Sequence, residues 1–417
     1  MRIVKLTQVL EKQLLRARQA RDVAAERVAA RIISEVRRRG DSALHSWTKK
    51  LDGVNLRSDG MWISQREMNA AKAQVRPDFL AAVQHAARNV RRVAEKQMPR
   101  PWNFEVEPGV NIGQIVRPIE AIGCYIPGGR FALVSTLVMT VVPAQVAGTR
   151  RIIAACPRPN RELLAAASIL GVRELARLGG AQAIAALAYG TQSIPRVEKI
   201  FGPGNRFVSA AKRMVSSDCA IDLPAGPTEA VFFATRGNPR WIAADLLAQA
   251  EHAPDAGSFL VTTSKSLAKQ VAAEVDAQLQ QLPLSNPAHV SIGRTGAIIL
   301  ARSSAAAADF IDRFAPEHLS LPRQGKTFMQ GLLSAGTVFV GPWAAQPLGD
   351  YASGSNHVLP TGGWGRRRGG LSTADFVKCI SVQSIGRRGF TRLAGDVQAL
   401  ARAEGLLAHA NAVEVRR

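Results

Sequence analysis

Paired cysteines, long apolar runs and acidic residues are all scarce in this chain, and each shortage excludes a class of protein. The four cysteines, at positions 124, 156, 219 and 379, include no CxxC pair, so we expect free thiols and neither a disulfide framework nor a zinc ribbon. The longest uncharged run, 131–149, contains Ser, Thr, Gln and Pro, which favours a buried strand and helix over a membrane span. The first 22 residues lack an apolar core with a cleavage site, so we expect a cytoplasmic protein.

The shortage of acidic residues leaves a net charge of +22, with 54 Lys and Arg against 32 Asp and Glu. Such a charge allows a second interpretation, a basic nucleic-acid-binding protein with steeply salt-dependent binding. Against it, the basic residues are spread along the whole chain, the densest run (366–368) is short, and no nucleic-acid-binding motif is present. Attraction of anionic cofactors and substrates explains the charge equally well, so we expect neither a nucleic-acid nor a membrane partner.

The order of apolar segments predicts an α/β protein. With 417 residues, 47% of them apolar, the chain is long enough for two or three domains. Residues 23–38 and 64–98 have helical periodicity, and 104–117 alternates like a hairpin with Pro108-Gly109 as its turn. From Pro118 onward, strand, loop and helix alternate through two series, 121–234 and 258–341. This alternation predicts two doubly wound, mostly parallel sheets built alike.

Loops that follow the strands of such a sheet gather at its carboxyl edge, where ligands bind. Three loops rich in Gly and Pro are placed to do this, at 127–129, 202–205 and 225–228. None is a GxGxxG fingerprint or a phosphate-binding P-loop. Ordinary tight turns are the alternative for each of them.

Residues with metal-binding and acid–base chemistry occur in three later stretches. Gln249 and His252 lie one turn apart near the end of a predicted helix, 241–253, so an amide oxygen and an imidazole nitrogen can bind one metal ion. Glu317 and His318 pair a carboxylate with an imidazole directly after another predicted helix, as general acid–base chemistry requires. Asp350 offers a further ligand. A polar surface is the alternative for each stretch, and spacing alone leaves open whether they meet in space.

Nine stretches in order resemble the histidinol dehydrogenase family over nearly the whole chain. They are DSALHSWTKKLDG, RPIEAIGCYIPGG, GGAQAIAALAYGT, KIFGPGNRFVSAAK, PAGPTEAV, DLLAQAEH, FAPEHL, GDYASGSNHVLPT and AEGLLAHANAV. The resemblance implies oxidation of L-histidinol to L-histidine through L-histidinal with two NAD, the last step of histidine biosynthesis. It also implies two Rossmann-like domains with small helical extensions, assembled as an intertwined homodimer.

The resemblance also assigns site residues and one zinc per subunit. It implies Glu317 and His318 as the catalytic pair. The implied substrate contacts are Thr228 and Glu404, the metal ligands and the catalytic pair itself. The implied zinc ligands are Gln249, His252, Asp350 and His409, and the implied NAD contacts are Tyr125, Gln182 and Asn205. It gives His357 no ligand role, so we expect structural hydrogen bonds there. The family usually has Ser where this chain has Thr228, which adds a methyl group near the substrate.

The alternation and the resemblance together predict a division of the chain. We expect an N-terminal helical arm at 1–22 and a first Rossmann-like domain, formed by 23–120 with 232–370, that carries the zinc and catalytic residues. We expect the second Rossmann-like domain, with the NAD-binding loops, at 121–231, and a helical tail at 371–417 that crosses to the partner subunit. The alternative enzyme is a paralogous zinc- and NAD-dependent dehydrogenase of another small polar alcohol; the residues Glu404 and His409 favour histidinol.

Overall fold

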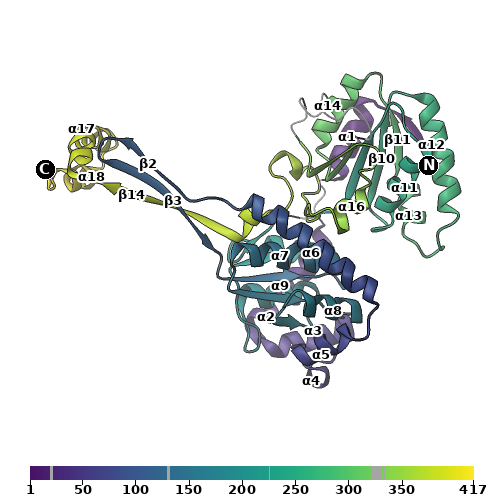
Figure 1. The fold of residues 1–417 in the computed structure, drawn as a ribbon, viewed down its shortest axis with the longest axis horizontal. Coiled ribbons are helices and arrows are strands. Elements are labelled where there is room, and N and C mark those ends of the chain that lie inside the picture. Colours follow the sequence, from purple (N-terminus) through teal and green to yellow (C-terminus); the bar gives the residue numbers. More distant parts are fainter. Residues whose placement is uncertain (19–21, 129–131, 225, 322–330, 332–333) are drawn as a thin grey trace.

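Two parallel sheets, each covered by helices on both faces, form the body of the protein (Figure 1). The computed structural model describes residues 1–18, 22–128, 132–224, 226–321, 331 and 334–417. The first sheet has six strands in the order β1-β11-β10-β9-β12-β13, and every neighbouring pair is parallel. These strands are β1 (Ile3–Lys5), β9 (Glu229–Phe233), β10 (Gly257–Thr262), β11 (Ala297–Leu300), β12 (His318–Leu321) and β13 (Thr337–Val340).

The central strands of this sheet are buried on both faces, which explains their continuous apolar runs. On one face, Phe232, Leu260 and Ile298 pack against α11 and α12. On the other, Val231 and Val261 pack against α14 and α1. The helices are α1 (Gln8–Ala17), α11 (Pro239–Ala250), α12 (Lys265–Leu279), α13 (Ala288–Arg294) and α14 (Ser304–Phe314).

The second sheet has five strands in the order β6-β5-β4-β7-β8, again all parallel. Its strands are β4 (Ala121–Tyr125), β5 (Arg151–Ala155), β6 (Glu174–Ala176), β7 (Lys199–Phe201) and β8 (Ala220–Ile221). One face is covered by α2 (Val23–Arg39), α3 (Asp41–Asp52), α9 (Gly180–Tyr189) and α10 (Arg206–Val215). The other is covered by α5 (Gln65–Lys72), α6 (Pro77–Gln97), α7 (Val134–Ala147) and α8 (Arg161–Ile169). The two parallel sheets confirm the predicted α/β class.

The helices between residues 23 and 97 pack on the second sheet, so the expected grouping of 23–120 with 232–370 is wrong for that segment. The apolar stripe of α2, including Ile32 and Val36, lies in the same core as Ile153 and Ile200 of the second sheet. Residues 3–17 are likewise part of the first sheet and its cover, because Ile3 pairs with Ile298 and Leu10 packs beside α14. An apolar stripe shows which side of a helix is buried, but it does not identify the sheet that buries it.

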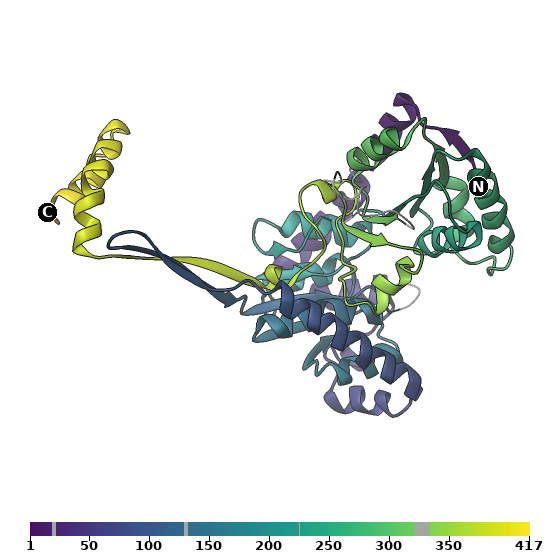
Figure 2. The same ribbon diagram turned by 45° about the horizontal axis from the view of Figure 1, so that its top comes forward.

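A third, antiparallel sheet forms an arm that projects from the body (Figures 1 and 2). It contains β2 (Trp102–Glu107), β3 (Val110–Pro118) and β14 (Val377–Ile385), and Gly109, with φ +87°, makes the predicted turn between the first two. The arm carries α17 (Arg387–Ala403) and α18 (Leu407–Glu414) at its far end. The tail at 371–417 is therefore not entirely helical, because β14 pairs with β3 along nine residues.

The remaining elements are short. They are α4 (Leu56–Asp59), α16 (Gln346–Tyr351) and two 3-10 turns, η1 (Trp364–Arg366) and η2 (Thr373–Phe376). Among the described residues, we find no helix with the length and apolar character needed to span a bilayer.

Candidate active site

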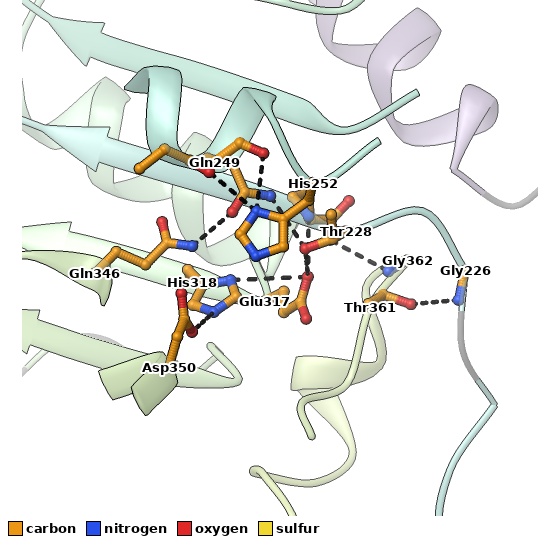
Figure 3. A network of polar contacts seen from close by, with 12 residues as sticks. Gly226, Thr228, Gln249, His252, Glu317, His318, Gln346, Asp350, Thr361 and Gly362 are labelled. Carbon is orange, nitrogen blue, oxygen red and sulfur yellow. Dashed lines mark hydrogen bonds and ion pairs between the residues drawn. The ribbon is translucent and has the colours of Figure 1, made fainter. Parts of the chain in front are cut away.

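The predicted acid–base pair lies at the amino end of β12, beside the amino end of the adjacent strand β9 of the first sheet (Figure 3). Glu317 directly precedes β12, and His318 is its first residue. Thr228 directly precedes β9. The C-terminal end of α11 contributes Gln249 and His252, and α16 contributes Asp350. One chain therefore brings together six of the residues predicted for metal, substrate and catalysis.

The turn between α14 and β12 aims the acid–base pair into the site. Helix α14 ends at Phe314, and Ala315 adopts a left-handed conformation with φ +49°, the one positive φ outside glycine among the described residues. Pro316 then prevents the helix from continuing. As a result Glu317 and His318 are both buried, with exposed fractions of 6% and 4%.

The Glu317 carboxylate is held through one of its two oxygens. Its Oε2 accepts hydrogen bonds from the Thr228 hydroxyl at 2.6 Å and from the Glu229 amide at 2.9 Å. The Thr228 hydroxyl in turn accepts a hydrogen bond from Gln249 Nε2 at 3.1 Å. Among the described residues, the polar contacts of this carboxylate fall on Oε2 and none falls on Oε1.

His318 lies between two carboxylates. Its Nδ1 is 3.7 Å from Glu317 Oε2, its Nε2 is 3.5 Å from Asp350 Oδ1, and its ring stacks on Phe339. Burial acts to lower the pKa of His318, but the charges of Glu317 and Asp350 outweigh it, and the net shift is upward. The imidazolium that forms when this ring takes a proton is therefore stabilised by its neighbours.

The pKa of the Asp350 carboxyl depends on the imidazoles around it. Burial alone would raise the pKa of its carboxyl, yet the hydrogen bond and charge of His318 lower that pKa below its ordinary value, with smaller contributions from His357 and His252. His357 donates or accepts at both ring nitrogens, with Nδ1 2.8 Å from the Asp350 carbonyl oxygen and Nε2 3.3 Å from the Thr136 hydroxyl. These are the structural hydrogen bonds expected for His357.

Gln249 and His252 each keep a lone pair beyond their hydrogen bonds within the protein. His252 Nδ1 lies 3.0 Å from the Ala248 carbonyl oxygen and 3.2 Å from that of Gln249, so its proton is used in hydrogen bonds to the backbone. The Nε2 lone pair then remains for a ligand, as in many metal-bound histidines. Gln249 is fully buried, and its Oε1 accepts from Gln346 Nε2 at 2.6 Å. An amide oxygen has two lone pairs, so it can also bind a metal ion.

The remaining predicted ligand and substrate contact lie elsewhere in the single chain. Glu404 follows α17 and His409 is in α18; both are exposed and stand at the far end of the arm (Figure 1). Accordingly, within the part of the chain that the structure describes, no group of three His, Cys, Asp or Glu residues could hold a metal. One chain alone does not assemble the predicted set of four zinc ligands.

The three predicted NAD contacts lie at the carboxyl edge of the second sheet. Tyr125 ends β4, and its buried hydroxyl accepts a hydrogen bond from the Gly180 amide at 3.1 Å. Asn205 follows β7 and caps α10 by accepting from two backbone amides. Gln182, on α9, donates to Asp52 at 3.0 Å, and burial raises the pKa of Asp52 to about 6. Gly129 and Ala225, in two of the predicted ligand loops, lie outside the described residues.

Several residues beside the site were not found by sequence reasoning. Glu229 forms a buried ion pair with Arg18, and its carboxylate also accepts from the Gly362 amide at 3.2 Å. Thr361 accepts a hydrogen bond from the Gly226 amide at 2.6 Å. Glu229 lies in PAGPTEAV, one of the stretches that carry the family resemblance, so the sequence gives a reason to examine it. Arg18 lies outside those stretches.

Comparison with known proteins identifies the family of this chain. The family model described as histidinol dehydrogenase matches residues 15–417. The chain belongs to the histidinol dehydrogenase family. It is 43% identical over 394 residues to the histidinol dehydrogenase of Aquifex aeolicus (strain VF5), covering 94% of this chain and 92% of that protein. It is also 43% identical to the histidinol dehydrogenase of Moorella thermoacetica, over 97% and 98% of the two chains.

The fold of this family member matches a solved histidinol dehydrogenase structure. The crystal structure of the enzyme from Elizabethkingia anophelis superimposes with a TM-score of 0.93 at 36% identity, over all of this chain and 97% of the other. The match therefore includes the projecting arm as well as the two parallel sheets.

Proposed function

We propose that this chain oxidises L-histidinol to L-histidine through L-histidinal, with two NAD per substrate, in the cytoplasm. The observation that carries the proposal is the buried pair of Glu317 and His318, adjacent to Asp350, Gln249 and His252, in a chain that belongs to this family. The carboxylate and the imidazole occupy different environments, which suits two separate proton transfers.

The first oxidation uses His318 as the base. The alcohol loses its O–H proton to His318 while a hydride leaves the same carbon for NAD, and a C=O bond forms. Glu317 and Asp350, 3.7 and 3.5 Å from the two ring nitrogens, stabilise the resulting imidazolium. Buried surroundings also retain the aldehyde within the site.

The second oxidation uses Glu317. Its Oε2 is fixed by Thr228 and the Glu229 amide, which leaves Oε1 to take a proton from a water that adds to the aldehyde. Because Glu317 keeps the water proton, the adduct is the hydrate monoanion, which loses a hydride from carbon to a second NAD and becomes the carboxylic acid. Holding the base through one oxygen fixes its orientation, and fixed orientation is a large part of the rate.

A zinc ion fits the donors of this site. We expect Gln249 Oε1, His252 Nε2 and an Asp350 oxygen to bind it, with His409 supplying the fourth ligand. The fit rests on the His252 hydrogen bonds to backbone, which free Nε2, and on the second lone pair of Gln249 Oε1. When bound, zinc supplies a positive centre that orients the imidazole and amine of histidinol.

His409 reaches a site only in a pair of chains. We propose a homodimer in which each arm crosses to the partner subunit and delivers His409 and Glu404 there. The support is that both residues stand at the end of an arm remote from the chain's own α11 and α16, which carry Gln249 and Asp350 (Figure 1). The arm also exposes large apolar side chains that a partner would cover: Trp102, Phe104, Val106, Ile380, Val382 and Ile385.

NAD is proposed to bind at the carboxyl edge of the second sheet, near Tyr125, Gln182 and Asn205. This edge follows β4 and β7 and meets the N-termini of α9 and α10, where backbone N–H groups favour phosphates. Thr228 is proposed to contact the substrate through the loop that joins the two sheets.

The test is the number of NADH formed per histidinol consumed. We expect two, and no comparable turnover of a panel of other amino alcohols; His318→Ala is the inactive control. One NADH per substrate, or a preference for another alcohol, would replace the proposal with the paralogous dehydrogenase. No turnover at all, with salt-sensitive binding to nucleic acid, would favour the nucleic-acid alternative instead.

A further inference from the structure

Arg18, the residue that follows α1, has its guanidinium buried beside the site. Its Nε donates to Glu229 Oε2 at 2.6 Å, and its Nη2 donates to Glu229 Oε1, so the pair is bidentate. The same guanidinium donates to the carbonyl oxygens of Phe314 and Ala315 and lies 3.6 Å from the centre of the Phe314 ring. Its side chain is only 11% exposed.

Both sets of partners are directly linked to the proposed base. The Glu229 amide donates to Glu317 Oε2 at 2.9 Å, so the residue paired with Arg18 also holds Glu317. Phe314 and Ala315 stand three and two residues before Glu317, in the turn that includes the left-handed Ala315. A non-glycine residue keeps this conformation only where its surroundings hold it. Arg18 thus joins the two backbone segments between which the Glu317 carboxylate is fixed.

The charge of Arg18 also matters, because two carboxylates meet here. Glu229 is buried, and burial raises the pKa of its carboxyl to about 7 even beside Arg18, with Glu317 adding to the rise. Without the guanidinium, Glu229 would face Glu317 as a second buried negative charge with the Gly362 amide as its remaining polar partner among the described residues. Such a charge is relieved by protonation or by movement, and either change reaches Glu317 through the Glu229 backbone.

We propose that Arg18 is a positioning residue for Glu317, acting through Glu229 and through the turn at 314–315. The inference rests on the proposed role of Glu317 and adds to it. It gives the N-terminal segment a part in the reaction, exerted through Glu229 and Glu317.

The competing explanation is that Arg18 only attaches α1 to the body. The structure supplies a matched control, because a second arginine also links α1 to α14. Arg313 pairs with Glu11, with Nη2 and Oε2 3.1 Å apart, and its side chain is half exposed. Leu10, Leu14 and Leu15 pack against the core under α14, so apolar contacts hold α1 as well. Arg313→Ala removes an attachment of α1 and leaves the contacts of Glu229 intact.

The experiment compares Arg18→Ala with Arg313→Ala in the full-length zinc-loaded enzyme. We expect Arg18→Ala to slow the oxidation of supplied histidinal on the order of 10²-fold, the cost of a displacement of about 1 Å at a reacting group. The KM for histidinol should stay within about threefold, because the lost interaction does not bind substrate in the ground state. Arg313→Ala should remain within about twofold of the parent, as for other exposed ion pairs.

Two further readouts separate positioning from attachment. Ethylguanidinium in the assay should restore part of the histidinal oxidation lost by Arg18→Ala and none of that lost by Glu317→Gln. In a double-mutant cycle, Arg18→Ala should cost little more once Glu317→Gln is present, because both changes remove the same function. Equal effects of the two arginine variants, or fully additive losses in the cycle, would overturn the inference.

A conservative variant covers the case in which Arg18→Ala does not fold. Arg18→Lys keeps the charge opposite Glu229 but cannot reach the carboxylate and both carbonyls at once, so we expect an intermediate loss that again vanishes in Glu317→Gln. Full activity of Arg18→Lys together with additivity would count against the inference. If Glu317→Gln itself oxidises histidinal normally, the proposed role of Glu317 fails. A fully active Arg18 variant beside an inactive Glu317→Gln is a different outcome, in which only the inference about Arg18 fails.

Discussion

Replacing Thr228 by Val tests how much of the second oxidation depends on holding Glu317 through one oxygen. Val has nearly the shape of Thr but lacks the hydroxyl that donates to Glu317 Oε2 at 2.6 Å and accepts from Gln249 at 3.1 Å. A hydrogen bond to a charged group contributes roughly 1.5–3 kcal/mol. If that interaction is fully lost in the transition state, the rate of histidinal oxidation falls by about 10- to 160-fold, since 1.36 kcal/mol is tenfold.

The matched variant is Thr228→Ser, which restores the residue usual in the family. It keeps both hydrogen bonds and removes one methyl group, which is worth at most about 0.8 kcal/mol when fully buried and less at this half-buried position. Histidinal oxidation should therefore stay within about fourfold of the parent rate. The assay is stopped-flow NADH formation from supplied histidinal, with thermal unfolding as the check on folding. A Val variant that is folded and as fast as the Ser variant would refute the role given to this hydroxyl.

Four other predictions follow from the proposed chemistry and assembly. Co-expression of His318→Ala with His409→Ala should restore about a quarter of the sites if arms cross, since one site of each heterodimer then carries both lesions and the other carries none. Heterodimers without recovered activity would contradict crossing. Chelation should abolish activity and zinc should restore it, unless a demonstrably metal-free preparation is fully active. His318→Ala should impair alcohol oxidation most, and Glu317→Gln should impair aldehyde oxidation most. If both variants lose the two half-reactions in the same proportion, the roles proposed for both residues are wrong. In the native protein Cys124, Cys156 and Cys219 should resist a thiol reagent, because burial raises the pKa of each thiol to about 12; fast labelling of any of these three would contradict this.

The central strands could be predicted because their apolar runs are a local property. β10 and β11 are buried along most of their lengths, and the sequence shows this directly. β12 is only four residues long, His318–Leu321, and its His and Ser interrupt the apolar pattern. It exists because β9 and β13 pair with it on both sides. The sequence predicts a helical tail where the arm strand β14 forms. This strand is exposed along most of its length and exists through its pairing with β3, so its own residues carry no buried-strand pattern.

The candidate site also contains residues that a local sequence pattern predicts and residues that only the fold brings together. The spacing of Gln249 and His252 on one helix face is local, so it was visible without coordinates. Thr228 and Glu317 are 89 residues apart and Arg18 and Glu229 are 211 apart, so no periodicity connects either pair. The family resemblance supplied the identity of most site residues. It did not supply the ion pair behind Glu317, because that depends on which segments the fold brings together.

The distance between His409 and the rest of the predicted ligand set has a thermodynamic consequence. A metal ion bound by residues of two chains couples metal affinity to subunit association, and such coupling is reciprocal. In the proposed dimer, whatever factor the partner's arm adds to zinc affinity, zinc must add to the affinity of one subunit for the other. Dilution of the enzyme would then release metal, and chelation would loosen the dimer, so neither equilibrium has a single constant independent of the other.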